Sequence, residues 1–313
     1  MCTAFHYRAS GSYMGRNMDI EFPLERKITI TPRQHPLYTK HQPTLNNHYA
    51  IVGMSTIVSN YPLYYDACNE YGLCMAALAF RDNAHYHDAR NERVNLAFYE
   101  LIPYTLATCK NVREALDLIG KVNLTPEQFN DELEASPLHF FVCDSHGSVT
   151  VEPTHEGLKI YENPVGVLTN NPPFPSMLDH LSCFISLSTD DICECAIPGV
   201  SIKARTRGLG AVGLPGDLTS PSRFVRAWFV KSNIVAEDTR DSEISAAFHV
   251  LSSVEQQRGL IKVGDALEYT AYSAVIDMES TTYYYRTYDG TCTNSVSLRA
   301  SDLDSDSLIS FEA

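Results

Sequence analysis

A cysteine stands directly behind the initiator methionine, and this position limits how the chain can fold. Removal of Met1, which is usual when a small residue follows, leaves a chain that begins with Cys2. One residue then carries both a thiol and a free α-amine. Their reference pKa values are about 8.5 and about 7.7 to 8.0, so the amine can accept the thiol proton near neutral pH. The chain terminus is therefore a candidate active site.

The first twenty residues predict a hairpin that returns the chain to Cys2. Thr3–Tyr7 and Tyr13–Asp19 have strand character, and a Ser-Gly-Ser turn lies between them. The second strand brings two charged residues back beside the terminus. We expect Asp19 to bind the α-ammonium and Arg16 to favour the thiolate by charge proximity. Taken alone, Cys2 is better interpreted as a buried cysteine of a first strand.

Sequence motifs far apart in the chain favour the chemical interpretation. They are MCTAFHYRASGSYMGRNMDIEF at the start, GVLTNNP from Gly166 and GLPGDLTSPSRFVRA from Gly213. Together they resemble the choloylglycine hydrolases, which comprise bile salt hydrolases and penicillin V acylases within the N-terminal nucleophile hydrolases. SSVEQQRGL from Ser252 and YYYRTYD from Tyr283 resemble the bile salt hydrolase branch. The resemblance covers nearly the whole chain and implies a linear-amide hydrolase with Cys2 as nucleophile and no cofactor.

Strand and helix patterns are mixed along the chain and predict an α+β fold. Further strands are expected at Lys27–Thr31, Tyr49–Ile57, Leu73–Phe80, Leu138–Cys143, Val149–Pro153, Leu158–Tyr161, Val165–Thr169, Tyr269–Asp277 and Thr281–Tyr288. Helices are expected at Phe98–Cys109, Val112–Ile119, Pro221–Val235 and Ser242–Val254. Strands grouped in hairpins indicate antiparallel sheets covered by helices. The resemblance implies a four-layer αββα sandwich of two such sheets. We expect one domain over residues 1–313, because no linker or repeat divides the chain.

The resemblance also implies roles for three further residues. Asn170 is expected to donate from its side chain to the oxyanion of the tetrahedral intermediate, and Arg223 to act in electrostatics and positioning. Ala79 stands where the bile salt hydrolase pattern GLxxAGLNF has asparagine, and its backbone N–H can still serve as an oxyanion donor. We therefore expect activity with altered kinetics. Without the resemblance, Asn170 is a turn asparagine and Arg223 a surface arginine of an amphipathic helix.

An apolar pocket for a flat steroid is implied by the same resemblance. Its expected lining is Met18, Val58, Tyr65, Phe129, Leu133 and Leu138. Any of these side chains is equally typical of an ordinary hydrophobic core. The bulk of Tyr65 is expected to reshape the pocket, without deciding between glycine and taurine conjugates.

Charge and composition exclude several classes of partner. A net charge of -14 argues against nucleic acid or an anionic membrane surface. No apolar run approaches the roughly 20 residues of a bilayer span, and the first residues lack the pattern of a signal peptide. Nine cysteines without regular spacing indicate reduced thiols, so we expect a cytoplasmic protein.

Two cysteines and two histidines are candidate metal ligands. Cys193 and Cys195 lack the second pair that structural zinc sites usually have, and His85 and His87 lie in a polar stretch typical of a loop. We expect no metal.

The leading function is a bile salt hydrolase that cleaves glycine- or taurine-conjugated bile acids through a thioester on Cys2. Transfer of the acyl group to another amine is a predicted side activity. The alternatives are a penicillin V acylase or other linear-amide amidohydrolase, and a bile-acid-binding protein without catalysis. A thiol or metal sensor using Cys193 and Cys195 is a third. The resemblance also implies a homotetramer.

Overall fold

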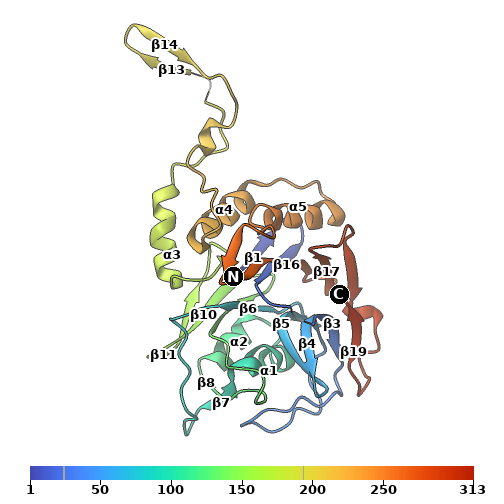
Figure 1. The fold of residues 1–313 in the computed structure, drawn as a ribbon. Coiled ribbons are helices and arrows are strands. Elements are labelled where there is room, and N and C mark those ends of the chain that lie inside the picture. The colour runs from blue at the N-terminus through green and yellow to red at the C-terminus, as the bar shows by residue number, and fades with distance from the viewer. Residues whose placement is uncertain (24, 193) are drawn as a thin grey trace.

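The computed structural model describes residues 1–23, 25–192 and 194–313, and it shows two antiparallel sheets stacked between layers of helices (Figure 1). The first sheet has the order β12 (Val167–Leu168), β1 (Cys2–Arg8), β2 (Ser12–Ile20), β16 (Ala266–Asp277), β17 (Thr282–Thr287) and β18 (Asn294–Ser297), and β15 (Ile261–Val263) also pairs with β16. The second has the order β11 (Gly157–Glu162), β10 (Ser148–Thr154), β9 (Leu138–Cys143), β6 (Cys74–Ala79), β5 (Tyr61–Asn69), β4 (Ile51–Val58), β3 (Lys27–Thr31) and β19 (Ile309–Glu312). The predicted αββα sandwich is confirmed.

Helices cover the outer faces of both sheets. The first sheet packs against α4 (Ser220–Asn233) and α5 (Arg240–Ser252), and the second packs against α1 (Leu101–Thr108), with α2 (Val112–Ile119) beside it. The remaining helix, α3 (Phe174–Leu181), leads into an arm that ends in the hairpin of β13 (Glu194–Ile197) and β14 (Val200–Lys203), which projects from the body. The short parallel pair β7 (Val94–Ala97) and β8 (Val122–Thr125) flanks α1 and α2. Single turns of 3-10 helix occur at Phe98–Glu100, Ser182–Phe184, Leu209–Ala211 and Leu298–Ala300.

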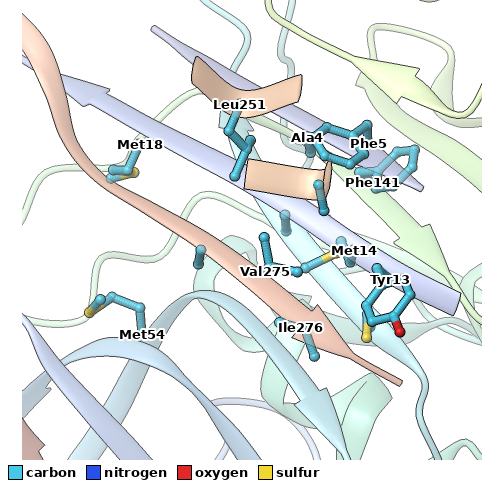
Figure 2. Close-up of a cluster of buried hydrophobic side chains, with 14 of the residues drawn as sticks. Ala4, Phe5, Tyr13, Met14, Met18, Met54, Phe141, Leu251, Val275 and Ile276 are labelled. Carbon is cyan, nitrogen blue, oxygen red and sulfur yellow. The ribbon is translucent and has the colours of Figure 1, made fainter. Parts of the chain in front are cut away.

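The core between the sheets is centred on the first hairpin. Every residue of β2 is buried, because β2 lies between β1 and β16 with α5 on one side and the second sheet on the other. Phe5 lies opposite Gly15, and an added Cβ at Gly15 would come within 2.2 Å of the Phe5 ring, so only glycine fits there. Figure 2 shows how side chains of both sheets and of α5 meet in this core. The labelled residues are Ala4, Phe5, Tyr13, Met14, Met18, Met54, Phe141, Leu251, Val275 and Ile276.

Most predicted elements occur within one to four residues of their expected bounds. The hairpin of β1 and β2 is confirmed, as are β3, β9 and α2, and the predicted helix Phe98–Cys109 begins as a 3-10 turn before α1. The predicted strand Val165–Thr169 shortens to β12, because Gly166 has a left-handed φ of 64°. Sequence reasoning missed β5, in which Pro62 and Asp66 interrupt the apolar alternation, and it missed α3.

Glu243 of α5 ties the turn of the first hairpin to the helix above it. Its carboxylate accepts hydrogen bonds from Ser10 N and Oγ (2.9 and 2.5 Å), Gly11 N (3.0 Å) and Tyr13 Oη (2.7 Å). Burial opposes ionisation of this group, but the donors of Ser10, Tyr13 and Gly11 outweigh it and lower its pKa from 4.5 to about 2. The charged carboxylate therefore stabilises the folded state.

We expect Glu243→Gln to lower the free energy of unfolding by about 2 kcal/mol at pH 7, because hydrogen bonds to a charged group contribute about 1.5–3 kcal/mol. The folded pKa lies below the unfolded one, so this stabilisation is complete above about pH 4.5 and is lost as the pH falls towards 2. Urea unfolding at a series of pH values from 7 to 3 measures it. Glu237→Gln, at an exposed site just before α5, is the matched control. A difference between Glu243→Gln and wild type that did not shrink at low pH would contradict this account.

Candidate active site

Cys2 begins β1 and lies at the edge of a deep cavity between the sheets. Its side chain is only 4% exposed, and its backbone N–H donates to Asn170 Oδ1 at 2.8 Å. The structure retains Met1, whose ammonium donates to Asp19 O (2.8 Å) and Glu268 Oε2 (2.9 Å), while Asp19 N donates to Met1 O (2.9 Å). The Met1–Cys2 peptide is thus part of the β1–β2 ladder. Loss of Met1 would place the new α-amine beside Asn170.

Asp19 lies next to the terminus but does not hold Met1 through its carboxylate. Its Oδ1 accepts from Thr270 Oγ1 at 2.6 Å, and its Oδ2 lies 3.8 Å from Arg223 Nη1. The predicted partner of the Asp19 carboxylate is the α-amine of Cys2, whereas the ammonium in the structure belongs to Met1, one residue earlier in the chain. This ammonium binds the Asp19 carbonyl instead. Binding of the Cys2 amine by the Asp19 carboxylate stays a prediction for the shortened chain.

Arg223 of α4 is fully buried and clamps the start of β1. Its Nη1 donates to Cys2 O (2.6 Å) and Thr3 Oγ1 (2.7 Å), and its Nη2 donates to Asn170 Oδ1 (2.8 Å). Burial lowers the pKa of this guanidinium, against Coulombic support from Asp19, Cys2 and Glu268. A surface arginine, which the helical pattern alone would allow, is excluded. From the sequence, Arg223 could be assigned only to the first turn of this helix, without a contact partner.

Asn170 and Ala79 face each other beside Cys2. Asn170 Nδ2 donates to Ala79 O at 2.8 Å, and Asn170 N donates to Ser220 Oγ at 2.8 Å. Ala79 is opposite Leu138 in the β6–β9 ladder, and the next residue, Phe80, donates its N–H to Pro137 O. Because neighbouring residues in an antiparallel ladder alternate in direction, the Ala79 N–H points away from β9, to the edge where Asn170 lies. The two predicted oxyanion donors, Asn170 and the Ala79 backbone, are therefore neighbours beside Cys2.

Arg16 lies on the neighbouring strand β2 opposite Ala4, two residue pairs from the Cys2–Met18 pair, and is 1% exposed. Its Nη2 donates to Ala77 O (2.7 Å) and Met18 Sδ (3.1 Å), and its Nε lies 3.6 Å from Asp66 Oδ2. Burial disfavours the charge, yet Coulombic attraction to Cys2, Tyr272, Asp66 and Asp19 raises the pKa of Arg16 above its ordinary value. A permanent cation is thus held close to the thiol, as predicted from the hairpin.

Two tyrosines of the first sheet hold Asp66 against Arg16. Tyr283 Oη donates to Asp66 Oδ1 at 2.5 Å, and Tyr272 Oη donates to Asp66 Oδ2. All three side chains are fully buried, and burial raises the pKa of Asp66 while Arg16 and the two hydroxyls lower it. Sequence reasoning missed this network. One feature of the sequence could have indicated it: Asp66 is a carboxylate in a mainly apolar strand, and a buried carboxylate needs a buried partner.

The cavity has a volume of about 550 Å³ and is lined mainly by apolar and aromatic side chains. Five of the six predicted lining residues are there: Met18, Tyr65, Phe129, Leu133 and Leu138. Val58 is not, because it lies at the turn end of β4, opposite Tyr61. Apolar residues that the sequence reasoning missed are Ile20, Phe22, Leu63, Tyr64, Ala77, Phe98, Tyr99, Ile102, Pro137 and Phe140. Many of these residues are neighbours in sequence of the predicted lining residues. The sequence does not specify how each strand or helix is oriented, and this orientation decides which neighbour faces the cavity.

Three of the four candidate metal ligands, His85, His87 and Cys195, lie among the described residues. Cys193 lies outside the described residues, and Cys195 is a free, exposed thiol. His85 stacks on His155 and contacts His87 edge-on, with ring centroids 3.9 and 4.6 Å apart. Within the described ranges, no cluster of three or more His, Cys, Asp or Glu side chains has an arrangement suited to a metal. Among the helices of the described residues, none is long and apolar enough to cross a bilayer.

Comparison with known proteins gives matches along nearly the entire chain. Residues 2–311 match the family described as linear amide C–N hydrolases, choloylglycine hydrolase family. A "Bile salt hydrolase/transferase" from Lactiplantibacillus plantarum is 46% identical over 99% of this chain and 96% of its own length. One from Clostridium perfringens is 30% identical over 100% of this chain and 97% of its own length.

Solved structures agree with these relatives. A mutant C2A conjugated bile acid hydrolase from Clostridium perfringens has a TM-score of 0.94 at 29% identity, covering 100% of this chain and 97% of that one. A penicillin V acylase from Agrobacterium tumefaciens has a TM-score of 0.80 at 22% identity, covering 99% and 91%, and shows the shared fold alone.

We expect Tyr283→Phe to lower the free energy of unfolding by about 2 kcal/mol, because it removes one donor from a buried carboxylate. Urea unfolding at pH 7 measures this. The matched control is Tyr284→Phe, the half-buried neighbour on the opposite face of β17. Equal effects of the two substitutions would mean that the hydrogen bond to Asp66 contributes nothing specific.

Proposed function

The chain belongs to the choloylglycine hydrolase family of linear amide C–N hydrolases, and we propose that within it the protein is a bile salt hydrolase. Its substrates are the glycine and taurine conjugates of bile acids. The observation that carries the proposal is the position of Cys2 in the lining of a mainly apolar cavity of about 550 Å³, with Arg16 in the same lining and Asn170 accepting a hydrogen bond from the Cys2 N–H. The names of the relatives support the choice of substrate.

The nucleophile is the thiol of Cys2 once Met1 is removed. The freed α-amine takes the thiol proton, and the charge of Arg16 stabilises the thiolate against burial. Asp19 binds the resulting α-ammonium. Retention of Met1 would convert this amine into a peptide N–H, which cannot act as a base, so the precursor is inactive.

Two donors then stabilise the tetrahedral intermediate. Sγ of Cys2 attacks the carbonyl carbon of the substrate amide, and the negative charge develops on the carbonyl oxygen. The N–H of Ala79 and the second N–H of the Asn170 amide point to this oxygen, because Asn170 uses one N–H on Ala79 O and has two. Arg223 keeps Asn170 in place through its Oδ1.

Collapse of this intermediate breaks the C–N bond. The α-ammonium of Cys2 gives its proton to the leaving nitrogen, and glycine or taurine departs. Water then attacks the thioester, its proton returns through the amine, and the bile acid leaves with regeneration of the thiol. Another amine that reaches the thioester before water forms a new amide. This transfer is the proposed side activity.

The size and apolar lining of the cavity favour a steroid acyl group. A penicillin V acylase, or another linear-amide hydrolase of the family, remains the alternative, and Ala79 is the residue that favours it. A binding protein without catalysis is disfavoured, because Arg16 lines the cavity together with Cys2 and Asn170 is hydrogen-bonded to the Cys2 backbone.

We also propose a cytoplasmic enzyme of one domain that forms a homotetramer. The exposed free thiols Cys183, Cys195 and Cys292 fit a reducing compartment. Exposed apolar side chains on the projecting arm, among them Val200 and Ile202, offer surface to other subunits.

We expect protein with a verified Cys2 terminus to release amino acid from glycocholate and taurocholate, and Cys2→Ala to release none. The assay is amino-acid release with penicillin V in parallel, and intact mass establishes that Met1 is absent. Protein that retains Met1 is the matched control and should be inactive, because it lacks the amine. Cleavage of penicillin V alone would favour the acylase, and no cleavage of any substrate would favour a binding protein.

In the same assay, excess free amino acid should yield new bile acid conjugates, because an amine can attack the thioester in place of water.

We expect Ala79→Asn to change KM or kcat for conjugated bile salts by at least about twofold while activity persists, because the backbone donor stays and a polar side chain is added at the cavity wall. Steady-state kinetics on both conjugates measures this. Ala77→Ser, at another cavity position of β6, controls for the insertion of a polar group. Unchanged constants for all substrates would mean that the side chain at position 79 has no part in substrate binding.

A further inference from the structure

The substrate of the proposed reaction ends in an anion, and most charged residues of the cavity repel it. Acidic side chains along the lining are Asp19, Glu21, Glu132 and Glu134. Among the described lining residues, arginine occurs at positions 16 and 81. The protein as a whole carries a net charge of -14. A conjugate with a carboxylate or a sulfonate therefore needs a specific cation at the place where its acidic end lies.

Arg16 and Arg223 cannot fill this role without leaving their partners. Arg16 is 1% exposed, bonded to Ala77 O and close to Asp66, and Arg223 is fully buried against Cys2, Thr3 and Asn170. Arg81 differs, because its side chain is 60% exposed and its guanidinium pairs with Glu21 at 2.8 Å. Glu21 is only 15% exposed, but the arginine end of the pair is open to solvent, where an ion pair contributes little to stability and a competing anion can reach the guanidinium.

The Arg81–Glu21 pair joins the two sheets beside the reacting residues. Glu21 follows β2 two residues after Asp19, and Arg81 follows β6 two residues after Ala79. The carbonyl of Arg81 also accepts a hydrogen bond from Asn171 Nδ2, next to Asn170. The Arg81–Glu21 hydrogen bond lowers the pKa of Glu21 and raises the pKa of Arg81, against the effect of burial in both cases. Two smaller charge effects act in the same directions. The Met1 ammonium lowers the pKa of Glu21, and Glu268, which binds that ammonium, raises the pKa of Arg81.

We propose that Arg81 binds the carboxylate or sulfonate of the conjugated amino acid, and that Glu21 competes with the substrate for it. This inference rests on the proposed function. With the amide carbonyl at Cys2 and its oxygen between Ala79 and Asn170, the carboxylate carbon of glycine lies roughly 2.5 Å beyond the amide nitrogen, two bonds away. The sulfonate of taurine lies one bond farther, and the long side chain of Arg81 accommodates either. Arg81 is thus a specificity-determining residue for the anionic leaving group.

Steady-state kinetics on glycocholate, taurocholate and the uncharged cholyl amide of ethanolamine tests this with protein lacking Met1. We expect Arg81→Gln to raise KM for both conjugates about tenfold, the effect of losing one charge-assisted contact, and to change KM for the uncharged amide less than about twofold. Arg81→Lys should restore part of the affinity. Glu21→Gln should lower KM for the conjugates, because Arg81 is then free. Arg113→Gln, an exposed arginine of α2 outside the cavity lining, removes the same charge and should leave all constants unchanged.

Salt dependence gives a second measurement that a purely structural role would not change. KM of the wild type for the conjugates should rise with ionic strength, and this dependence should be weaker in Arg81→Gln. Equal losses on charged and uncharged amides, or unchanged constants in Arg81→Gln, would overturn the assignment of Arg81 while leaving the hydrolase intact. Failure of wild-type protein with a Cys2 terminus to cleave any of the three amides would instead overturn the proposed function, and the role of Arg81 with it.

Discussion

The buried guanidinium of Arg223 holds the start of the chain in the position that the chemistry requires. Chain termini usually fray, because few contacts hold them. Here Nη1 and Nη2 of Arg223 bind the carbonyl of Cys2, the hydroxyl of Thr3 and the amide oxygen of Asn170, and the Asp19 carboxylate lies 3.8 Å away. These acceptors offset the large cost of burying a charge. The positions of the proposed nucleophile, of its amine base and of one proposed oxyanion donor therefore depend on a single side chain.

A second buried arginine has a different task on the other side of Cys2. Two nitrogens of Arg16, Nε and Nη1, have no hydrogen-bond partner among the described residues, although Nε is 3.6 Å from Asp66. Its hydrogen-bond donors are thus less fully used than those of Arg223, and in the proposed mechanism its charge acts on the neighbouring thiol. Asp66, Tyr272 and Tyr283 limit this charge and keep the side chain in place. We propose that Arg223 determines the geometry of the site, because its Nη1 and Nη2 are bound, whereas Arg16 supplies a positive potential at the thiol.

The cavity is lined mainly by apolar side chains, with the charged residues Glu21 and Arg81 just after the ends of β2 and β6. Its walls are strands of both sheets and the segment around α1, and their backbones are fixed by ladders. Where β2 and β6 end, the sheets are joined by the Arg81–Glu21 ion pair, whose arginine is 60% exposed. Ala79 lies two residues before Arg81 and is proposed to act through its backbone, so its side chain can vary without loss of that donor. In the proposed mechanism, acyl-group binding and leaving-group binding therefore use different parts of the site.

The amino-acid sequence by itself determined most local elements and singled out the residues that are proposed to react. Alternation and turn residues predicted the hairpin that carries Arg16 and Asp19 back to Cys2, because strand and turn preferences depend on a few neighbouring residues. The motif resemblance supplied Asn170 and Arg223. Only the tertiary structure decided that Arg223 is buried, that Val58 lies outside the cavity, that two tyrosines bind Asp66, and that Arg81 meets Glu21. Each of these depends on how one sheet stacks on the other, which no local pattern in the sequence specifies.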